Sequence, residues 1–166
     1  MTSPFLHLLG LGLAENDLDA VRGFVRRTLR AECRTLEIGC GPGRFADLFA
    51  NGDYVGVDPR PDFVAYARRH RPGAFVCDDP SAIGLPDARF DQILGLDVLG
   101  GSTDGVSRAI VAEMKRLLAP VGRALLVERA DRGVRVERLA AGLGRIERRD
   151  RLKSGWRDRV ALLVTT

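Results

Sequence analysis

Residues 35–45 constrain the fold of this chain more than any other segment. They read Thr-Leu-Glu-Ile-Gly-Cys-Gly-Pro-Gly-Arg-Phe, a short apolar strand followed by a glycine loop and the expected start of a helix. Gly39, Gly41 and Gly43 allow a sharp turn and let the backbone come close to a ligand. The helix after the loop would point its unpaired N–H groups and positive dipole end at that ligand.

Strand and helix patterns alternate along the chain. Strands are predicted over residues 34–39, 54–58, 74–77, 91–96 and 123–128. Helices are predicted over residues 16–31, from residue 44 onward, and over 61–70 and 104–118. The remaining residues predict a helix over 133–142 and two strands over 145–151 and 159–165, joined by a polar turn. The alternation indicates a doubly wound α/β sheet of seven strands that ends in an antiparallel pair.

Composition favours a soluble protein with a single domain over residues 1–166. Apolar residues make up 45% and charged residues 29% of the chain, and its length suits one sizeable core. No apolar run approaches the ~20 residues that cross a bilayer. The three cysteines form no CxxC pair, so we expect free thiols and a cytoplasmic location. His, Cys and carboxylate residues show no metal-ligand spacing, which predicts no metal site.

Acidic residues follow three of the predicted strands. Asp58 ends the second strand, Asp78 and Asp79 follow the third, and Asp97 follows the fourth. A single aspartate at such a place commonly caps a turn. Asp58 lies 19 positions after Gly39, a spacing that favours recognition of a ribose.

The glycine spacing separates two kinds of nucleoside ligand. A dinucleotide loop needs its third glycine at position 44, where this chain has Arg44. The loop also contains no Walker lysine, which disfavours a nucleoside triphosphate. A nicotinamide-dependent oxidoreductase is therefore the weaker interpretation.

Four segments in order resemble the motifs of the class I S-adenosylmethionine-dependent methyltransferases, of the small type-11-like kind. They are Glu37-Ile-Gly-Cys-Gly-Pro-Gly43, Gly56-Val-Asp58, Cys77-Asp-Asp79 with the later Leu85–Asp91, and the turn over 117–127. The resemblance implies a Rossmann-like sheet with strand order 3-2-1-4-5-7-6 and an antiparallel strand seven. It also implies S-adenosyl-L-methionine as the cofactor.

The resemblance also assigns roles in cofactor binding. The glycine loop would hold the methionine end, Asp58 the ribose, and Asp79 the adenine amino group, with Asp78 as the alternate. The cofactor-binding residues that we predict are Glu37, Gly39, Gly41, Gly43, Asp58, Asp78, Asp79 and Leu96.

The acceptor side departs from the family pattern. Residues 96–101 resemble the frequent x-D/E-V-L-E-H stretch, but Gly100 and Gly101 replace its Glu and His. Asp97 is the remaining polar candidate near the transferred methyl group. His7 is a weak candidate for a substrate contact, and His70 is expected to be a solvated cation at a helix end. The cap over residues 1–33 is short, so a large substrate or a partner subunit, as in a homodimer, would complete the site.

Three functions stay open. The leading hypothesis is a methyltransferase for a small metabolite or biosynthetic intermediate. Residues 128–166 carry 11 basic and 6 acidic side chains, so a macromolecular acceptor such as RNA is an alternative. Interspersed acids in residues 145–159 favour a self-paired, solvated surface instead. A non-catalytic module that binds the cofactor and assists a partner protein is the third hypothesis.

Overall fold

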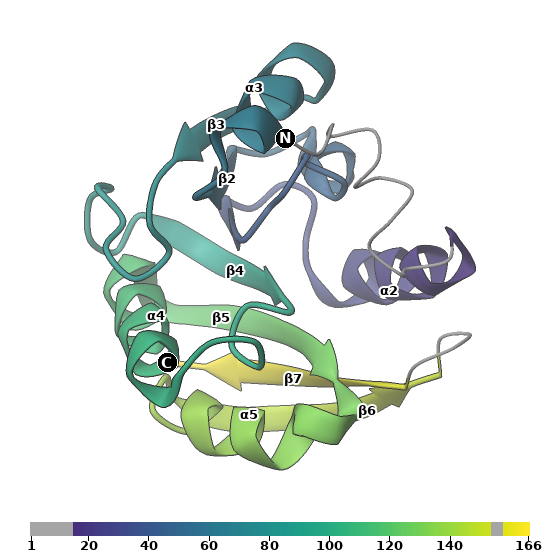
Figure 1. Ribbon diagram of the computed structural model, residues 1–166, viewed down its shortest axis with the longest axis vertical. Coiled ribbons are helices and arrows are strands. Elements are labelled where there is room, and N and C mark those ends of the chain that lie inside the picture. The colour runs from purple at the N-terminus through teal and green to yellow at the C-terminus, as the bar shows by residue number, and fades with distance from the viewer. Residues whose placement is uncertain (1–14, 154–157) are drawn as a thin grey trace.

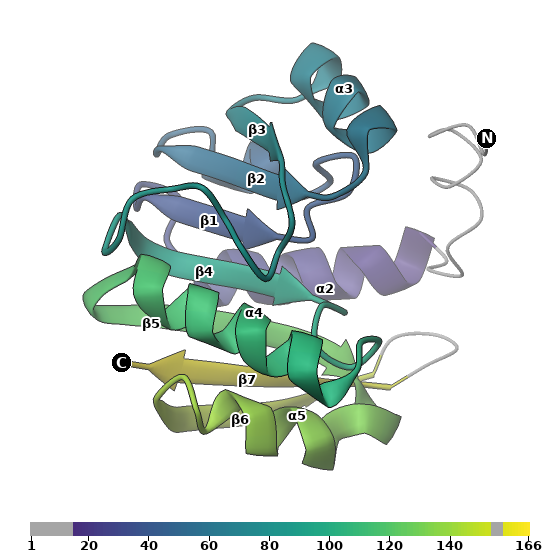
Figure 2. The same cartoon turned by 60° about the vertical axis from the view of Figure 1, so that its left-hand side comes forward.

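The computed structural model describes residues 15–153 and 158–166. Within them, seven strands form one sheet in the order β3-β2-β1-β4-β5-β7-β6, which is the predicted order. β7 pairs antiparallel with both of its neighbours, and the other neighbouring strands are parallel. Figure 2 shows the whole sheet, with β7 pointing against the others. The strands are β1 (Thr35–Ile38), β2 (Tyr54–Asp58), β3 (Ala74–Cys77), β4 (Phe90–Leu96), β5 (Leu118–Arg129), β6 (Arg145–Leu152) and β7 (Arg159–Thr165).

Helices cover both faces of the sheet (Figure 1), so the predicted doubly wound α/β fold is confirmed. The helices are α2 (Glu15–Thr28), α3 (Pro61–His70), α4 (Asp104–Leu117) and α5 (Gly133–Ala140), with the short 3-10 helices η1 (Ala46–Phe49) and η2 (Ala130–Arg132). One buried apolar cluster joins α4 and α5 to the sheet. A second cluster joins α2, η1 and α3 to it.

Side-chain periodicity explains why the chain divides into these two clusters. Successive residues of a strand point to opposite faces, so Ile93 of β4 lies in the α4–α5 cluster and Leu94 in the other. In α4, the buried residues Ile110, Met114 and Leu117 recur at the spacing of one helix face. Each face of the sheet therefore buries its own set of apolar side chains.

One predicted helix is wrong. We expected a helix from Arg44, but the glycine loop leads through turns into η1, which is a single 3-10 turn. Only a short connection is left before β2, and Gly52 packs so tightly that an added Cβ would lie 2.7 Å from the carbonyl oxygen of Cys33. The loop is therefore not followed by an α-helix whose dipole could attract a ligand, and that part of the prediction fails.

Other boundaries differ less. β5 begins at Leu118, five residues earlier than predicted, because Leu118 pairs with Phe90 before a bulge in the ladder. Pro120 and Gly122 therefore lie within the strand and not before it. No helix of residues 15–153 and 158–166 is long and apolar enough to cross a membrane. His7 and the first part of the predicted cap lie outside the described residues.

Candidate active site

A cavity of about 650 Å³ opens at the carboxyl ends of the parallel strands. Its walls come from the loops after β1, β2, β3 and β4, from the end of β5 and the start of β7, and from α2 and α4. Strand order reverses between β1 and β4, which is where open α/β sheets bind their ligands. The volume falls within the range of about 300–1,000 Å³ that is usual for small-molecule sites.

The glycine loop forms the wall above β1. Gly39, Gly41 and Gly43 all have positive φ angles, of 73°, 53° and 73°. Gly39 and Gly41 line the cavity. Gly43 lies outside that lining, and an added Cβ there would come within 2.9 Å of the Phe75 ring. Gly43 therefore serves the packing of the loop against β3.

Glu37 lies at the base of the loop with only 2% of its surface exposed. The hydroxyl of Tyr54 donates a hydrogen bond to its carboxylate. Burial raises the pKa of Glu37 to about 8, although the Tyr54 bond lowers it in part. Because Glu37 also lines the cavity, a bound cation would favour its ionised form.

Asp58 is equally buried and fixes the glycine loop. Its Oδ2 accepts a hydrogen bond of 2.8 Å from the N–H of Gly41. Its Oδ1 accepts two bonds from Arg60, 3.0 Å from the backbone N–H and 3.2 Å from Nε. A carboxylate accepts about four hydrogen bonds. Asp58 can therefore accept one ribose hydroxyl as it stands, and a second only if the Arg60 side chain moves.

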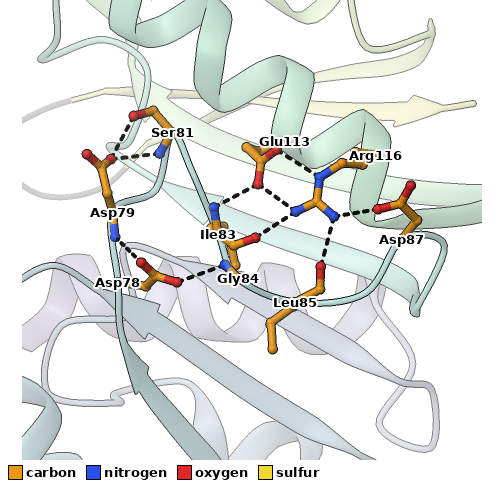
Figure 3. Close-up of polar contacts among 9 residues, drawn as sticks. All are labelled: Asp78, Asp79, Ser81, Ile83, Gly84, Leu85, Asp87, Glu113 and Arg116. Carbon is orange, nitrogen blue, oxygen red and sulfur yellow. Dashed lines mark hydrogen bonds and ion pairs between the residues drawn. The ribbon is translucent and has the colours of Figure 1, made fainter.

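The two aspartates after β3 have different surroundings (Figure 3). Asp78 accepts hydrogen bonds from the N–H groups of Asp79 and Gly84, at 2.9 and 2.8 Å, so it closes its own loop. Asp79 lines the cavity and accepts bonds from the N–H and hydroxyl of Ser81, which hold its pKa below the ordinary value. Geometry thus favours Asp79 over Asp78 as a ligand contact.

Arg116 of α4 anchors this loop from the other side (Figure 3). Its guanidinium donates hydrogen bonds to the carbonyl oxygens of Leu85 and Ile83, at 2.8 and 2.7 Å. It also pairs with Glu113 and Asp87. The loop that carries Asp79 is therefore held in place by α4.

Leu96 and Asp97 lie where β4 ends, and both line the cavity. Asp97 has a φ angle of 54°, which is rare for a residue with a side chain. Its Oδ2 accepts a bond of 2.8 Å from Nη1 of Arg159, the first residue of β7. The Arg159 side chain is almost fully buried, at 4% exposed. Asp97 thus lines the cavity, and its carboxylate is engaged in an ion pair.

Gly100 lies where the family pattern has glutamate, and the structure explains the change. The fully buried carboxylate of Glu128 accepts bonds from the N–H groups of Leu99 and Gly100, at 2.7 and 3.1 Å. A Cβ on Gly100 would lie 2.5 Å from Cδ of Arg132 and 2.7 Å from the Glu128 carboxylate. The glycine therefore makes room for Arg132. Burial raises the pKa of Glu128 to about 7.

Sequence reasoning assigned no role in the site to the five arginines of the cavity wall, which are Arg44, Arg60, Arg129, Arg132 and Arg159. We predicted that residues 145–159 form a self-paired surface, and the ion pairs of Arg148, Arg149 and Arg151 agree with this. Arg159 differs because β7 runs antiparallel, which brings its first residue to the cavity edge opposite Arg129. The predicted direction of β7 was the signal that could have revealed it.

The described residues offer little support for thiol chemistry or metal binding. Cys33, Cys40 and Cys77 are all free thiols. Burial raises the pKa of Cys40, so this cavity thiol is a poor nucleophile. Among the described residues, no group of three or more His, Cys, Asp or Glu side chains could hold a metal ion.

Comparison with known proteins identifies the family. Residues 36–126 match the model of the methyltransferase domain family, which is more than half of the chain. The chain therefore belongs to this family, and its predicted place among the class I S-adenosylmethionine-dependent methyltransferases is confirmed. No curated protein sequence matches the chain at a significant level.

Solved structures share the fold at low identity. The PH0226 protein of Pyrococcus horikoshii OT3 is 15% identical with a TM-score of 0.76, covering 92% of this chain and 91% of that one. Magnesium protoporphyrin IX methyltransferase of Synechocystis PCC 6803, with bound S-adenosylmethionine, is 17% identical with a TM-score of 0.74, covering 98% and 90%. The 1,6-didemethyltoxoflavin-N1-methyltransferase of Burkholderia thailandensis is 20% identical with a TM-score of 0.74, covering 92% and 79%.

Proposed function

We propose that this protein transfers the methyl group of S-adenosylmethionine to a small organic acceptor. The observation that carries the proposal is the division of one cavity into two chemically different halves. The glycine loop, three acids and two arginines surround the half above β1 and β2, namely Glu37, Asp58, Asp79, Arg44 and Arg60. Apolar side chains of β4 and α4 and three arginines surround the other half, which we assign to the acceptor.

The chemistry asks little of the protein beyond positioning. When bound, the cofactor supplies an activated methyl group on a sulfonium. The bond from the methyl carbon to sulfur breaks, sulfur keeps the electron pair, and the acceptor atom forms the new bond and releases its proton to solvent. Holding the acceptor in line can contribute about 7–11 kcal/mol. A strong base is not needed for an acceptor that is already nucleophilic.

Several observations favour a small acceptor over RNA. Two similar structures bear the names of methyltransferases for small molecules, a porphyrin and a toxoflavin precursor. The exposed arginines of β6 are paired with Asp150, Glu137 and Asp158, which reduces their attraction for phosphates. We propose further that the protein is cytoplasmic. A homodimer that completes the site is part of the same proposal.

Calorimetry with S-adenosylmethionine and S-adenosylhomocysteine tests the cofactor half. Incubation with S-adenosylmethionine and pooled metabolites, followed by measurement of released S-adenosylhomocysteine, tests transfer. We expect binding of both cofactor forms and release with at least one pool. Absence of binding would contradict the proposal. Tight binding without release on any pool would favour a non-catalytic module, for which the engagement of Asp97 by Arg159 is the supporting observation.

A further inference from the structure

Three arginines line the acceptor half of the cavity, and Asp97 is the carboxylate that lines it with them. Arg129 and Arg159 lie directly opposite one another on the antiparallel strands β5 and β7. Like charges in that position destabilise a sheet unless something offsets them. Arg132 follows on η2 and lines the same cavity. Three arginines thus line one end of the cavity.

Neighbouring acids use only a small part of the hydrogen-bonding capacity of these arginines. Each guanidinium has five N–H donors. Arg129 donates from two nitrogens to Asp131, and Arg159 donates from one to Asp97. Within the described residues, Arg132 donates no hydrogen bond that would compete with a ligand.

Arg159 supplies the second, independent observation. The whole residue is 3% exposed and lines the cavity. Its Nε is buried and has no hydrogen-bond partner among the described residues. Burying a charged donor without a hydrogen-bond partner costs free energy. A ligand that accepts a hydrogen bond from this donor should therefore gain more binding free energy than a ligand at an exposed arginine.

The rest of this half is apolar. Val98 of the loop after β4, and Val106 and Ile110 of α4, line the cavity beside the arginines. Val106 is 44% exposed, so it offers apolar surface to a ligand. The wall therefore suits a ligand with an apolar body and one charged end.

Resting on the proposed methyltransferase function, we infer that the methyl acceptor is an anionic organic molecule whose charged group binds Arg129, Arg132 and Arg159. Asp97 is a positioning residue that orients Arg159 through their ion pair. A negative acceptor also offsets the positive charge of the sulfonium next to it. A planar guanidinium binds a carboxylate or a phosphate with two parallel hydrogen bonds, so both groups share the required chemistry.

Binding to the S-adenosylhomocysteine complex tests the inference without knowledge of the natural acceptor. Benzoate, phenyl phosphate and the neutral benzamide are titrated into the protein saturated with S-adenosylhomocysteine. We expect at least one anion to bind about tenfold tighter than benzamide. Preference for benzoate assigns a carboxylate, and preference for phenyl phosphate assigns a phosphate. Equal binding of all three probes, or binding of none, would overturn the inference.

Single-residue variants test where on the protein the anion binds. Arg132→Gln should weaken binding of the preferred anion by about tenfold or more, because one charge-assisted contact is lost. Asp97→Asn should weaken it less and spare S-adenosylhomocysteine. Arg145→Gln removes an equal charge from the exposed surface of β6 and should change nothing. If Arg132→Gln and Arg145→Gln weakened anion binding equally, the net charge of the protein and not a specific site would determine the affinity. That result would overturn the inference.

Binding of two compounds related to the cofactor distinguishes a failure of this inference from a failure of the proposed function. S-adenosylhomocysteine and 5′-methylthioadenosine, which lacks the amino acid, are measured with wild type and Arg132→Gln. Failure of wild type to bind S-adenosylhomocysteine would refute the proposed function itself. A loss for S-adenosylhomocysteine but not for 5′-methylthioadenosine in Arg132→Gln would show that Arg132 holds the cofactor carboxylate, which overturns only the inference. We expect unchanged affinity for both.

Discussion

The two halves of the cavity differ in how they hold charge. Above β1 and β2, two buried carboxylates accept hydrogen bonds, Glu37 from Tyr54, and Asp58 from the N–H of Gly41 and from Arg60. Above β5 and β7, arginines are held by carboxylates, with Asp97 on Arg159 and Asp131 on Arg129. One half therefore suits a ligand that donates hydrogen bonds to carboxylates. The other half suits a ligand that accepts hydrogen bonds and carries negative charge.

The difference also shows how each half is encoded. The first half comes from a continuous glycine loop and one acid at a fixed distance, and both are local features of sequence. The second half combines the ends of β4, β5 and β7, which are far apart along the chain. Substitutions in one half at a time test whether the two halves of the cavity bind different parts of the ligands.

The largest effect concerns Glu37 and pH. Its pKa in the folded protein is about 8, above the ordinary value of 4.5, so the folded state binds the proton more tightly than the unfolded state. Stability from this group is therefore full below the ordinary pKa and is lost as pH rises to the folded value. Between about pH 5 and pH 8, the free energy of unfolding of wild type should fall by about 3–4 kcal/mol relative to Glu37→Gln.

Urea denaturation of both proteins across this pH range measures the difference. The contribution of Glu128, whose pKa is also raised, is present in both proteins and cancels. Parallel curves for wild type and Glu37→Gln would contradict the account. If the cofactor ammonium lies near Glu37, cofactor binding below pH 8 should also release a proton, which calorimetry in buffers of different ionisation enthalpy detects.

The second effect concerns Asp58 and the cofactor. Asp58→Ala removes a ribose acceptor and the bond that fixes Gly41, so the affinity for S-adenosylhomocysteine should fall by about 1.5–3 kcal/mol. Calorimetry measures this change. Asp53→Ala, at an exposed aspartate outside the cavity lining, is the matched control and should bind like wild type. A folded Asp58→Ala protein with unchanged affinity would reject the ribose role.

The third effect concerns Gly100 in the other half. An alanine Cβ there would clash with Arg132 and Glu128, so Gly100→Ala should reduce the free energy of unfolding by about 1–2 kcal/mol. It should also weaken anion binding while sparing S-adenosylhomocysteine. Gly105→Ala, where no atom lies within 4 Å of the added Cβ, should instead stabilise α4 by about 0.4–1 kcal/mol. Chemical denaturation of both variants gives the comparison, and equal effects would show that Gly100 has no special role.

The smallest predicted effect is that of a substitution on the protein surface, outside both halves of the cavity. Arg151 and Asp158 form an exposed ion pair at 3.1 Å between β6 and the start of β7. Arg151→Gln should change the free energy of unfolding by no more than about 0.5 kcal/mol, because solvent screens such pairs. It should leave both the cofactor and the anion affinities unchanged. A large change in either affinity would mean that the site extends over β6.

Sequence reasoning predicted the fold well because the sheet follows from local patterns. The bounds of β2, α3, β3 and β7 agree with prediction. The strand order also agrees, but it was implied by the resemblance to the class I methyltransferases and not by local patterns. The predicted helix after the glycine loop was wrong: the chain forms only the 3-10 turn η1, and Gly52 then packs tightly against the backbone of residues 31–33. No local pattern in the sequence reveals that contact.

The site was predicted unevenly for the same reason. Most of the predicted site residues line the cavity, namely Glu37, Gly39, Gly41, Asp58, Asp79, Leu96 and Asp97. Gly43 instead allows the glycine loop to pack against β3, and Asp78 accepts hydrogen bonds within its own loop. Sequence patterns reveal that a residue is near a strand end, but not whether its side chain faces the ligand or its own loop. The arginines of the acceptor half needed the antiparallel register of β5 and β7 to be recognised.

A crystal structure of the complex with S-adenosylhomocysteine tests the division most directly. The division of the cavity predicts a ribose hydroxyl within hydrogen-bond distance of Asp58, the adenine near Asp79, and the sulfur directed toward Asp97. Arg129, Arg132 and Arg159 should make no contact with the cofactor. A cofactor carboxylate bound by these arginines, or an adenosine over β5 and β7, would contradict it.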